Sequence, residues 1–128
     1  MDNLNLIIRQ YLSSVGSEFF ISFEDKLGYL YGFTRLLLPL DDNTVDIPGL
    51  GPQTAILREL HVYGTQEKIG EKGDNQHSGL GKRLLNIAEK KAKESGYERL
   101  SVISGVGVRE YYRKLGYQLV GTYMMKEL

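Results

Sequence analysis

The chain has 128 residues, 41% of them hydrophobic and 25% charged, which is the composition of one globular domain spanning residues 1–128. Cysteine is absent, which excludes disulfides, thiolate zinc sites, iron–sulfur clusters and a cysteine nucleophile. The two histidines, His61 and His77, are too few for a polyhistidine site, and we expect no metal. No apolar run of about 18 residues and no signal peptide is visible, so we expect a cytoplasmic protein without a membrane partner.

The formal net charge is zero, but the two halves of the chain differ in charge. Residues 1–64 carry four Lys/Arg against eight Asp/Glu, whereas residues 65–128 carry twelve against eight. This asymmetry indicates either a polyanion that meets the second half or a solvated basic helix face.

The first half of the chain favours strands. Residues 4–11 form a mixed apolar run that fits a strand or a helix. Three further segments are rich in aromatic and branched side chains and predict strands: 18–24, 29–39 and 54–63. Two polar stretches that contain glycine, 41–53 and 64–75, predict loops.

The second half changes to a helical period. Between residues 79 and 95, apolar residues recur on one helical face, namely Leu80, Leu84, Ile87 and Ala88. The elements expected after it are a strand over 99–104, a short helix over 108–115, and terminal strands over 117–120 and 123–126. When two strands of one sheet are joined by a helix, the connection crosses over the sheet and the two strands run parallel. We therefore predict an α/β fold of the α+β type, with one parallel strand pair in a mostly antiparallel mixed sheet flanked by helices.

The segment QHSGLGKR at residues 76–83 stands between a predicted strand and a predicted helix. Its two glycines let the backbone approach a ligand closely, and the first amides of a helix attract phosphate. A P-loop would need Ser or Thr after the lysine, and a dinucleotide fingerprint would need a third glycine. The remaining pattern, Q-x-x-G-x-G, predicts a pyrophosphate cradle or only a loop before a helix. The candidate cradle residues are Gln76, Ser78, Gly79, Leu80, Gly81 and Lys82.

A second motif, YYRKLGY at residues 111–117, follows the predicted strand over 99–104. Together with Q-x-x-G-x-G it resembles the GNAT acetyltransferase superfamily. ELHVYG (59–64), SVISGVGVREYYRKLGY (101–117) and YMMKEL (123–128) are similar, more specifically, to the C-terminal acetyltransferase domain of Elongator-type enzymes, which modify the tRNA wobble uridine. This resemblance is strongest over residues 54–128. It implies the GNAT fold, with acetyl-CoA as co-substrate.

The resemblance also implies where acetyl-CoA binds. The strand over 59–62 should splay from the strand over 100–104, so that the pantetheine arm inserts between them like a missing strand. The main chain of Leu60, His61 and Val62 would hold the acyl end, and residues 78–82 would hold the pyrophosphate. Tyr112 matches the family tyrosine near the sulfur, where a phenol can protonate the departing thiolate. Tyr111 stands beside it, and the alternative for both tyrosines is packing in a core.

Glu59 and His61 alternate with Leu60, which predicts that both face the same side of the strand near the co-substrate. Either can serve as a general base. The alternative is an exposed or hydrogen-bonded polar pair on the sheet face.

Elongator-type enzymes also carry a radical S-adenosylmethionine domain with a cysteine-ligated cluster, and this chain has no cysteine. The chain is therefore a fragment or a free-standing relative. We expect acetyl-CoA to be used in tRNA wobble-uridine modification or in acetyl transfer to an amine, which would be direct because no cysteine can carry the acetyl group. tRNA or a separate radical S-adenosylmethionine protein is the expected partner. The alternative function is a non-catalytic acyl-CoA sensor or RNA-docking module.

Overall fold

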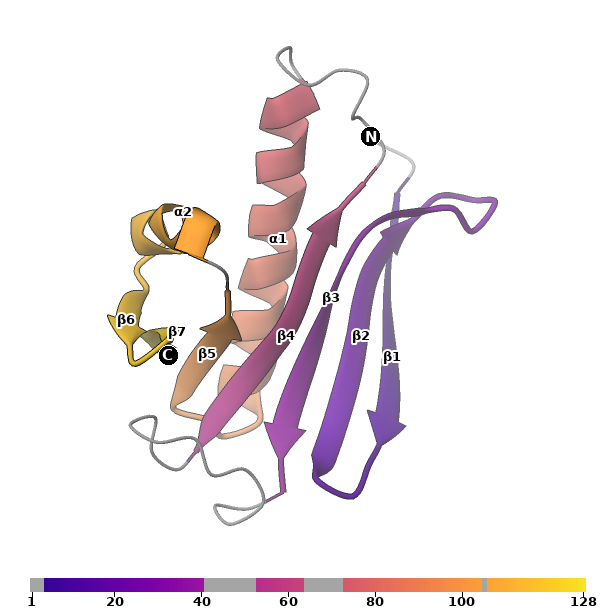
Figure 1. Cartoon of the computed structure of the whole chain (residues 1–128). Helices are drawn as coiled ribbons and strands as arrows, with labels where there is room; N and C mark the ends of the chain where they lie inside the picture. Colours follow the sequence, from indigo (N-terminus) through magenta and orange to yellow (C-terminus); the bar gives the residue numbers. More distant parts are fainter. Residues whose placement is uncertain (1–3, 41–52, 64–72, 105) are drawn as a thin grey trace.

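The computed structural model describes residues 4–40, 53–63, 73–104 and 106–128, without the side chains of residues 73–78 and 106 (Figure 1). The strands in these ranges are β1 (Asn5–Leu12), β2 (Gly16–Glu24), β3 (Leu30–Pro39), β4 (Thr54–Val62), β5 (Arg99–Ile103), β6 (Gln118–Val120) and β7 (Tyr123–Glu127). The helices are α1 (Gly73–Glu94) and α2 (Arg109–Lys114), the latter preceded by a single 3₁₀ turn, Val106–Val108.

The described strands form one mixed sheet in the order β1-β2-β3-β4-β5-β7-β6. Strands β1 to β4 run antiparallel in succession, and β7 pairs antiparallel with β5 and β6. Only β4 and β5 are parallel, which confirms the predicted parallel pair. The run over residues 4–11, for which strand and helix were both open, is a strand at the edge of the sheet.

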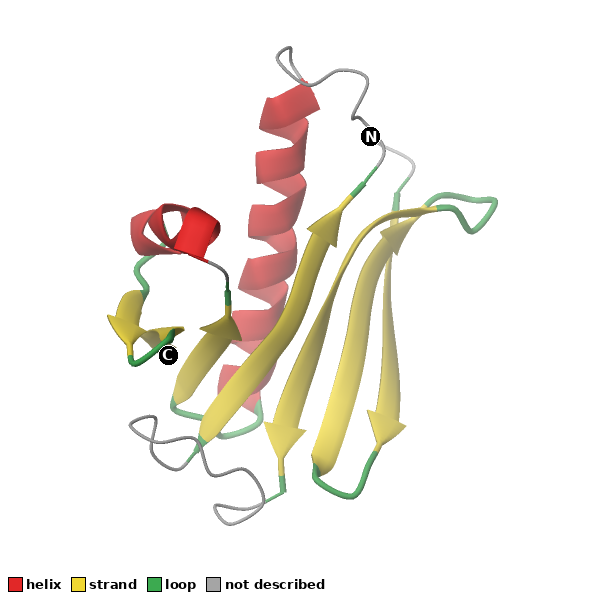
Figure 2. Ribbon diagram, viewed as in Figure 1, coloured by secondary structure: helices red, strands yellow, loops and turns green. Residues whose placement is uncertain are grey.

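Helix α1 lies across one face of the sheet (Figure 2). Its buried side chains include the predicted Leu80, Leu84 and Ala88, which join one core with Ile21 of β2. Gly32 of β3 lets the helix come close, because a Cβ there would lie 3.2 Å from a Leu80 methyl and 3.3 Å from a Leu84 methyl. The apolar stripe of α1 and the small residue opposite it therefore set the distance between the two layers.

Helix α1 begins at Gly73, six residues before the predicted start. The prediction of a loop was therefore wrong for residues 73–75, while residues 64–72 and 41–52 lie outside the described residues. Glycine is a weak stop signal inside a helix, because it costs only about 1 kcal/mol relative to alanine. Continued helical hydrogen bonding outweighs that cost here.

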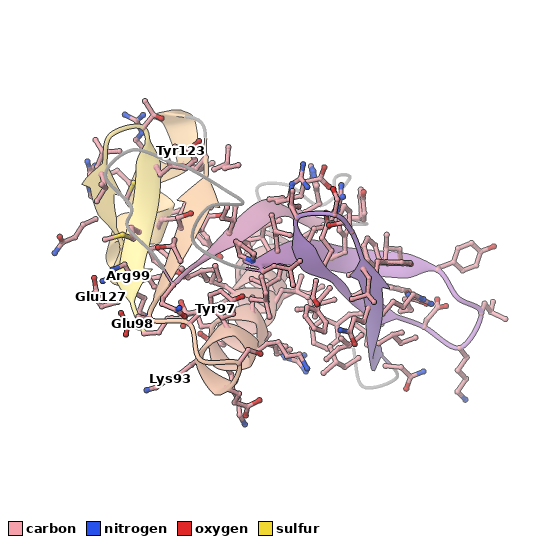
Figure 3. The ribbon with its side chains drawn as sticks, turned by 90° about the horizontal axis from the view of Figure 1, so that it is seen from below. Lys93, Tyr97, Glu98, Arg99, Tyr123 and Glu127 are labelled. Atoms are coloured by element: carbon pink, nitrogen blue, oxygen red, sulfur yellow. The ribbon has the colours of Figure 1, made fainter. Side chains whose placement is uncertain are left out.

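Two polar clusters tie the C-terminal elements to the rest of the fold. The buried Tyr117 hydroxyl donates to Glu89 of α1 at 2.6 Å, and the Lys126 ammonium of β7 lies 3.3 Å from the same carboxylate. Just after the C-terminal end of α1, the Tyr97 hydroxyl donates to the Pro39 carbonyl. Nearby, Arg99 lies between Glu98 and Glu127, at 3.6 and 3.3 Å (Figure 3). These contacts fix β5 and β7 relative to α1 and β3.

None of the helices in the described part of the chain is long and apolar enough to cross a membrane.

Replacing Leu84 with alanine should lower the free energy of unfolding by about 3 kcal/mol, because the site is fully buried and would leave a cavity. Leu119→Ala on the edge strand β6 is the control, since that side chain is 39% exposed and should cost less than about 1 kcal/mol. Denaturant unfolding measures both. Equal losses would contradict the assignment of Leu84 to the core.

Candidate active site in the cleft between β4 and β5

The site begins where the parallel strands separate. β4 and β5 are paired from Thr54 and Arg99 to Leu57 and Val102, after which β4 continues to Val62 without β5 beside it. A bulge at Arg58 marks this point, because Glu59 and Leu57 pair with consecutive residues of β3. A β-bulge bends its strand and increases the local twist. The main chain of β4 after the bulge is therefore left with an open edge toward β5.

Thr34 of β3 supports this bulge. Its side chain is fully buried, and its hydroxyl donates to the main-chain carbonyl of Glu59. The bond satisfies the carbonyl directly after the extra residue of β4. Thr34 thus holds the strand in the geometry that opens the sheet.

The separation leaves a cleft of about 440 Å³. The end of β4, the segment after β5, α1 and α2 all contribute to its wall, through Arg58, Glu59, Leu60, His61, Val62, Gly81, Ile103, Ser104, Val108, Tyr111 and Tyr112. Segments that are up to half the chain apart in sequence therefore meet at one opening in the sheet.

The structure brings seven of the predicted site residues to this cleft: Glu59, Leu60, His61, Val62, Gly81, Tyr111 and Tyr112. Gly79, Leu80 and Lys82 do not line it. Gly79 and Lys82 are exposed on α1, Leu80 is 4% exposed and belongs to the core, and the side chains of Gln76 and Ser78 lie outside the described residues. Sequence reasoning did not single out Arg58, Ile103, Ser104 and Val108. The last three lie within the run over 101–117 that carries the resemblance, but nothing in the run marks them as site residues.

Residues 76–82, predicted to lie before and at the start of a helix, are all part of α1. Interior helix amides donate to carbonyls four residues earlier, so a helix that begins at Gly73 pairs the amides of residues 78–82 internally, and their role in a pyrophosphate cradle stays a prediction. Gly81 has another role, since a Cβ there would lie 3.1 Å from the Tyr111 hydroxyl and 3.6 Å from a Val62 methyl. It allows α1, α2 and β4 to approach one another at the cleft.

Glu59 and His61 lie on the face of β4 that points away from α1, since Leu60 and Val62 pack against the core. The His61 ring lies 5.3 Å from the Phe33 ring. The Glu59 carboxylate lies 3.7 Å from the Arg35 guanidinium. Both side chains are accessible at the rim, so a carboxylate and an imidazole are available there to accept a proton.

Tyr112 lines the cleft from the opposite side and is also part of the core. Its ring packs edge-on between those of Tyr111 and Tyr117, at 5.2 and 5.6 Å between centroids. Burial raises the pKa of Tyr112 to about 12, and burial also raises the pKa of Tyr111. Both phenols are therefore protonated hydrogen-bond donors at neutral pH.

No group of three or more His, Asp or Glu side chains in the described ranges could hold a metal ion. The cleft instead offers main-chain groups, two phenols and an accessible proton acceptor. That set suits an extended ligand with a reactive end that must receive a proton when a bond breaks.

A mixed sheet opened by a bulge before a parallel partner, with a tyrosine on the following helix, defines a GNAT-type acetyltransferase domain. The family model described as "Acetyltransferase (GNAT) domain" matches residues 72–127. Within that class the chain is related to the Elongator group. It is 50% identical over 121 residues to the "tRNA uridine(34) acetyltransferase" of Dehalococcoides mccartyi, covering 92% of this chain and 26% of the relative.

Two further matches support the same relationship. The chain is 44% identical over 131 residues to "Elongator complex protein 3" of Saccharomyces cerevisiae, covering 99% of this chain and 24% of the relative. The structure of Elp3 from the archaeon Methanocaldococcus infernus superposes with a TM-score of 0.84 at 41% identity, over 99% of this chain and 30% of that chain. The resemblance to GNAT and Elongator-type domains is thereby confirmed. The chain spans about a quarter of the length of the curated relatives it matches.

Replacing Thr34 with valine should remove the hydrogen bond to Glu59 while keeping the side-chain shape. We expect a loss of about 1 to 2 kcal/mol in unfolding free energy, because a buried carbonyl loses its partner. Hydrogen exchange at the amides of residues 58–62 should rise more than at β2, since the bulge is loosened. The exposed Thr122→Val serves as control. Unchanged exchange around the bulge would show that Thr34 does not hold it.

Proposed function

We propose that this domain binds acetyl-CoA in the β4–β5 cleft and uses it in modification of the tRNA wobble uridine or in acetyl transfer to an amine. The observation that carries the proposal is the open edge of β4 after the bulge, with Tyr112 beside it in the same cleft. The name of the 50% identical relative, tRNA uridine(34) acetyltransferase, supports the choice of acetyl-CoA and tRNA as substrates.

The pantetheine arm suits this opening because it is extended and carries amide groups. It would lie along Leu60, His61 and Val62 and use their main-chain groups as a neighbouring strand would. The diphosphate end would then lie toward the N-terminal turns of α1, where the first amides have no partner within the helix. In this proposal, residues 76–82 contribute as part of the N-terminal turns of α1, as the helix N-terminus predicted from the sequence.

In this proposal, residues on the two sides of the cleft carry out different proton transfers. When acetyl passes to an amine, Glu59 or His61 takes the proton that the amine nitrogen loses, and the carbonyl carbon forms its new bond to that nitrogen. The carbon–sulfur bond breaks, and the sulfur receives a proton from the Tyr112 hydroxyl. Burial raises the pKa of Tyr112 to about 12, so its hydroxyl is protonated at neutral pH and can act as the donor.

The complete modification of tRNA would need more than this domain. We propose that the domain works with a radical S-adenosylmethionine domain or protein, which the resemblance to Elongator-type enzymes implies. A tRNA-modifying role would place the protein in the cytoplasm.

Calorimetric titration should show binding of acetyl-CoA and coenzyme A but not of ATP. Tyr112→Phe should leave acetyl-CoA affinity nearly unchanged and lower turnover about 100-fold, the usual contribution of a general acid. Coenzyme A release can be followed with a thiol reagent in the presence of tRNA, because the chain has no cysteine of its own. The ratio of wild-type to variant turnover should stay constant between about pH 6 and 9, because Tyr112 does not ionise there.

Tyr123→Phe on β7 is the matched control, since Tyr123 is partly buried and does not line the cleft. Its turnover should equal that of the wild type. An equal loss of affinity and turnover in Tyr112→Phe would assign Tyr112 to packing alone. No binding of either coenzyme A form would refute the proposed function.

A second candidate function is RNA docking without catalysis, which the excess of basic residues in the second half favours. On α1, Arg83 and Lys91 lie over the rings of Phe23 and Phe19, at 4.5 and 4.7 Å from the ring centroids. Lys90 and Lys93 are both exposed on α1 and are available to contact phosphates.

If this surface contacts tRNA, the double variant Lys90→Gln/Lys93→Gln should bind tRNA more weakly at low salt. The slope of log affinity against log salt should also fall by about 1 to 2, as counterion release at two phosphates is lost. Lys26→Gln in the acidic half is the control. Identical slopes in all three proteins would exclude α1 as the RNA-binding surface.

A further inference from the structure

Glu89 of α1 holds two polar groups from the C-terminal part of the fold. The Tyr117 hydroxyl donates to its Oε2 atom at 2.6 Å, and the Lys126 ammonium lies 3.3 Å from the same atom. The cluster is largely withdrawn from water, since Tyr117 is 2% exposed and the Glu89 side chain 15%. The motifs of the sequence do not include Glu89, and the proposed reaction does not use it directly.

Stability alone does not explain a hydrogen-bonded charge at this position. A phenylalanine in place of Tyr117 would fill nearly the same volume without withdrawing a hydroxyl from water. Buried ion pairs add little net stability, because the loss of hydration offsets most of their attraction. A buried polar cluster whose members are paired does, however, favour one fixed arrangement of the elements that carry it. Burial and the hydrogen bond to Glu89 raise the pKa of Tyr117, so its hydroxyl remains the donor at physiological pH.

Tyr117 in turn contacts Tyr112 in two ways. Its main-chain amide donates to the Tyr112 carbonyl at 3.1 Å, and the two rings pack edge-on with 5.6 Å between their centroids. Helix α2, which carries Tyr112, has 6 residues and no side-chain hydrogen bond at its N-cap, Val108. So short a helix is not stable by its own hydrogen bonds. Its orientation therefore depends on the residues that anchor it, and Tyr117 ties its C-terminal end to α1.

We propose that Glu89 is a positioning residue for Tyr112. By fixing the Tyr117 hydroxyl, it fixes the ring against which Tyr112 packs, and thereby the place of the Tyr112 hydroxyl in the cleft. The inference rests on the proposed function, in which that hydroxyl protonates the departing sulfur. A proton donor must lie within hydrogen-bond reach of the receiving atom, so a small displacement lowers turnover more than it lowers affinity.

Tyr97 provides a matched control just after the C-terminal end of α1 (Figure 3). Its partly buried hydroxyl also joins two elements, because it donates to the Pro39 carbonyl of β3, but Tyr97 does not line the cleft. Tyr97→Phe and Tyr117→Phe remove the same group, and only the second should affect the reaction. At position 89, Glu89→Gln keeps an oxygen that can accept from Tyr117, whereas Glu89→Leu does not.

Turnover and acetyl-CoA affinity test the proposal in these variants, each with and without Tyr112→Phe. We expect Tyr117→Phe and Glu89→Leu to lower turnover about 10-fold, while affinity changes less than about 2-fold. Glu89→Gln should keep most of the turnover and Tyr97→Phe all of it. In the Tyr112→Phe background, neither Tyr117→Phe nor Glu89→Leu should lower turnover further, because the donor that they position is already gone.

Nuclear magnetic resonance of the tyrosine rings in the unliganded protein tests the positioning without the reaction. With isotope-labelled tyrosine, the Tyr112 signal is identified by its loss in Tyr112→Phe. It should shift in Glu89→Leu, where neither ring beside Tyr112 has been replaced, and stay in place in Glu89→Gln and Tyr97→Phe. Circular dichroism establishes that each variant is folded, and Tyr117→Phe carries the kinetic test if Glu89→Leu is not.

A further loss of turnover on top of Tyr112→Phe would mean that Glu89 only stabilises the fold, which refutes the inference. An unshifted Tyr112 signal in Glu89→Leu refutes it as well. If Tyr112→Phe is as active as the wild type, there is no donor to position, and the inference falls while the acetyl-CoA site stands. If the wild type neither binds nor uses acetyl-CoA, the proposed function fails, and the Tyr112 signal then decides whether Glu89 sets the position of that ring.

Discussion

The bulge at Arg58 is the constraint on which the rest of the site depends. It is placed by the register of β3 with β4 and held by the hydroxyl of Thr34 on the carbonyl of Glu59. Without it, β4 and β5 could remain paired beyond Leu57, as neighbouring parallel strands do by default. The sheet would then be closed where it now opens, and α2 would have no cleft to face.

The same packing that stabilises the fold also positions the chemical groups. α2 is held against α1 through Tyr117, whose hydroxyl binds Glu89, and Tyr112 packs edge-on against the Tyr117 ring. Gly81 then lets the Tyr111 hydroxyl approach α1 closely. Core packing and site membership are therefore not competing explanations for Tyr112, because one contact network provides both.

Much of this architecture could be predicted from local sequence. Aromatic and branched runs identified β2, β3 and β4, and the strand–helix–strand order identified the parallel pair. The start of α1 could not be predicted from local sequence. A glycine such as Gly81 fits a turn or a close contact between helices equally well until its neighbours are known. Ser104 was missed for a related reason. Whether a serine hydroxyl has a hydrogen-bond partner depends on its neighbours in space, and the sequence alone does not show them.

The two faces of the sheet at the opening carry different chemistry. Tyr112 approaches from the side of α1 as a buried, protonated phenol, whereas Glu59 and His61 stand at the accessible rim on the other face. In the proposed reaction, a group that loses a proton and a group that gains one would be served from opposite sides of the sheet. Such a division suits direct transfer in a ternary complex, and it agrees with a chain that has no cysteine to carry an acyl group. The opening in the sheet is what brings side chains of both faces to one cleft.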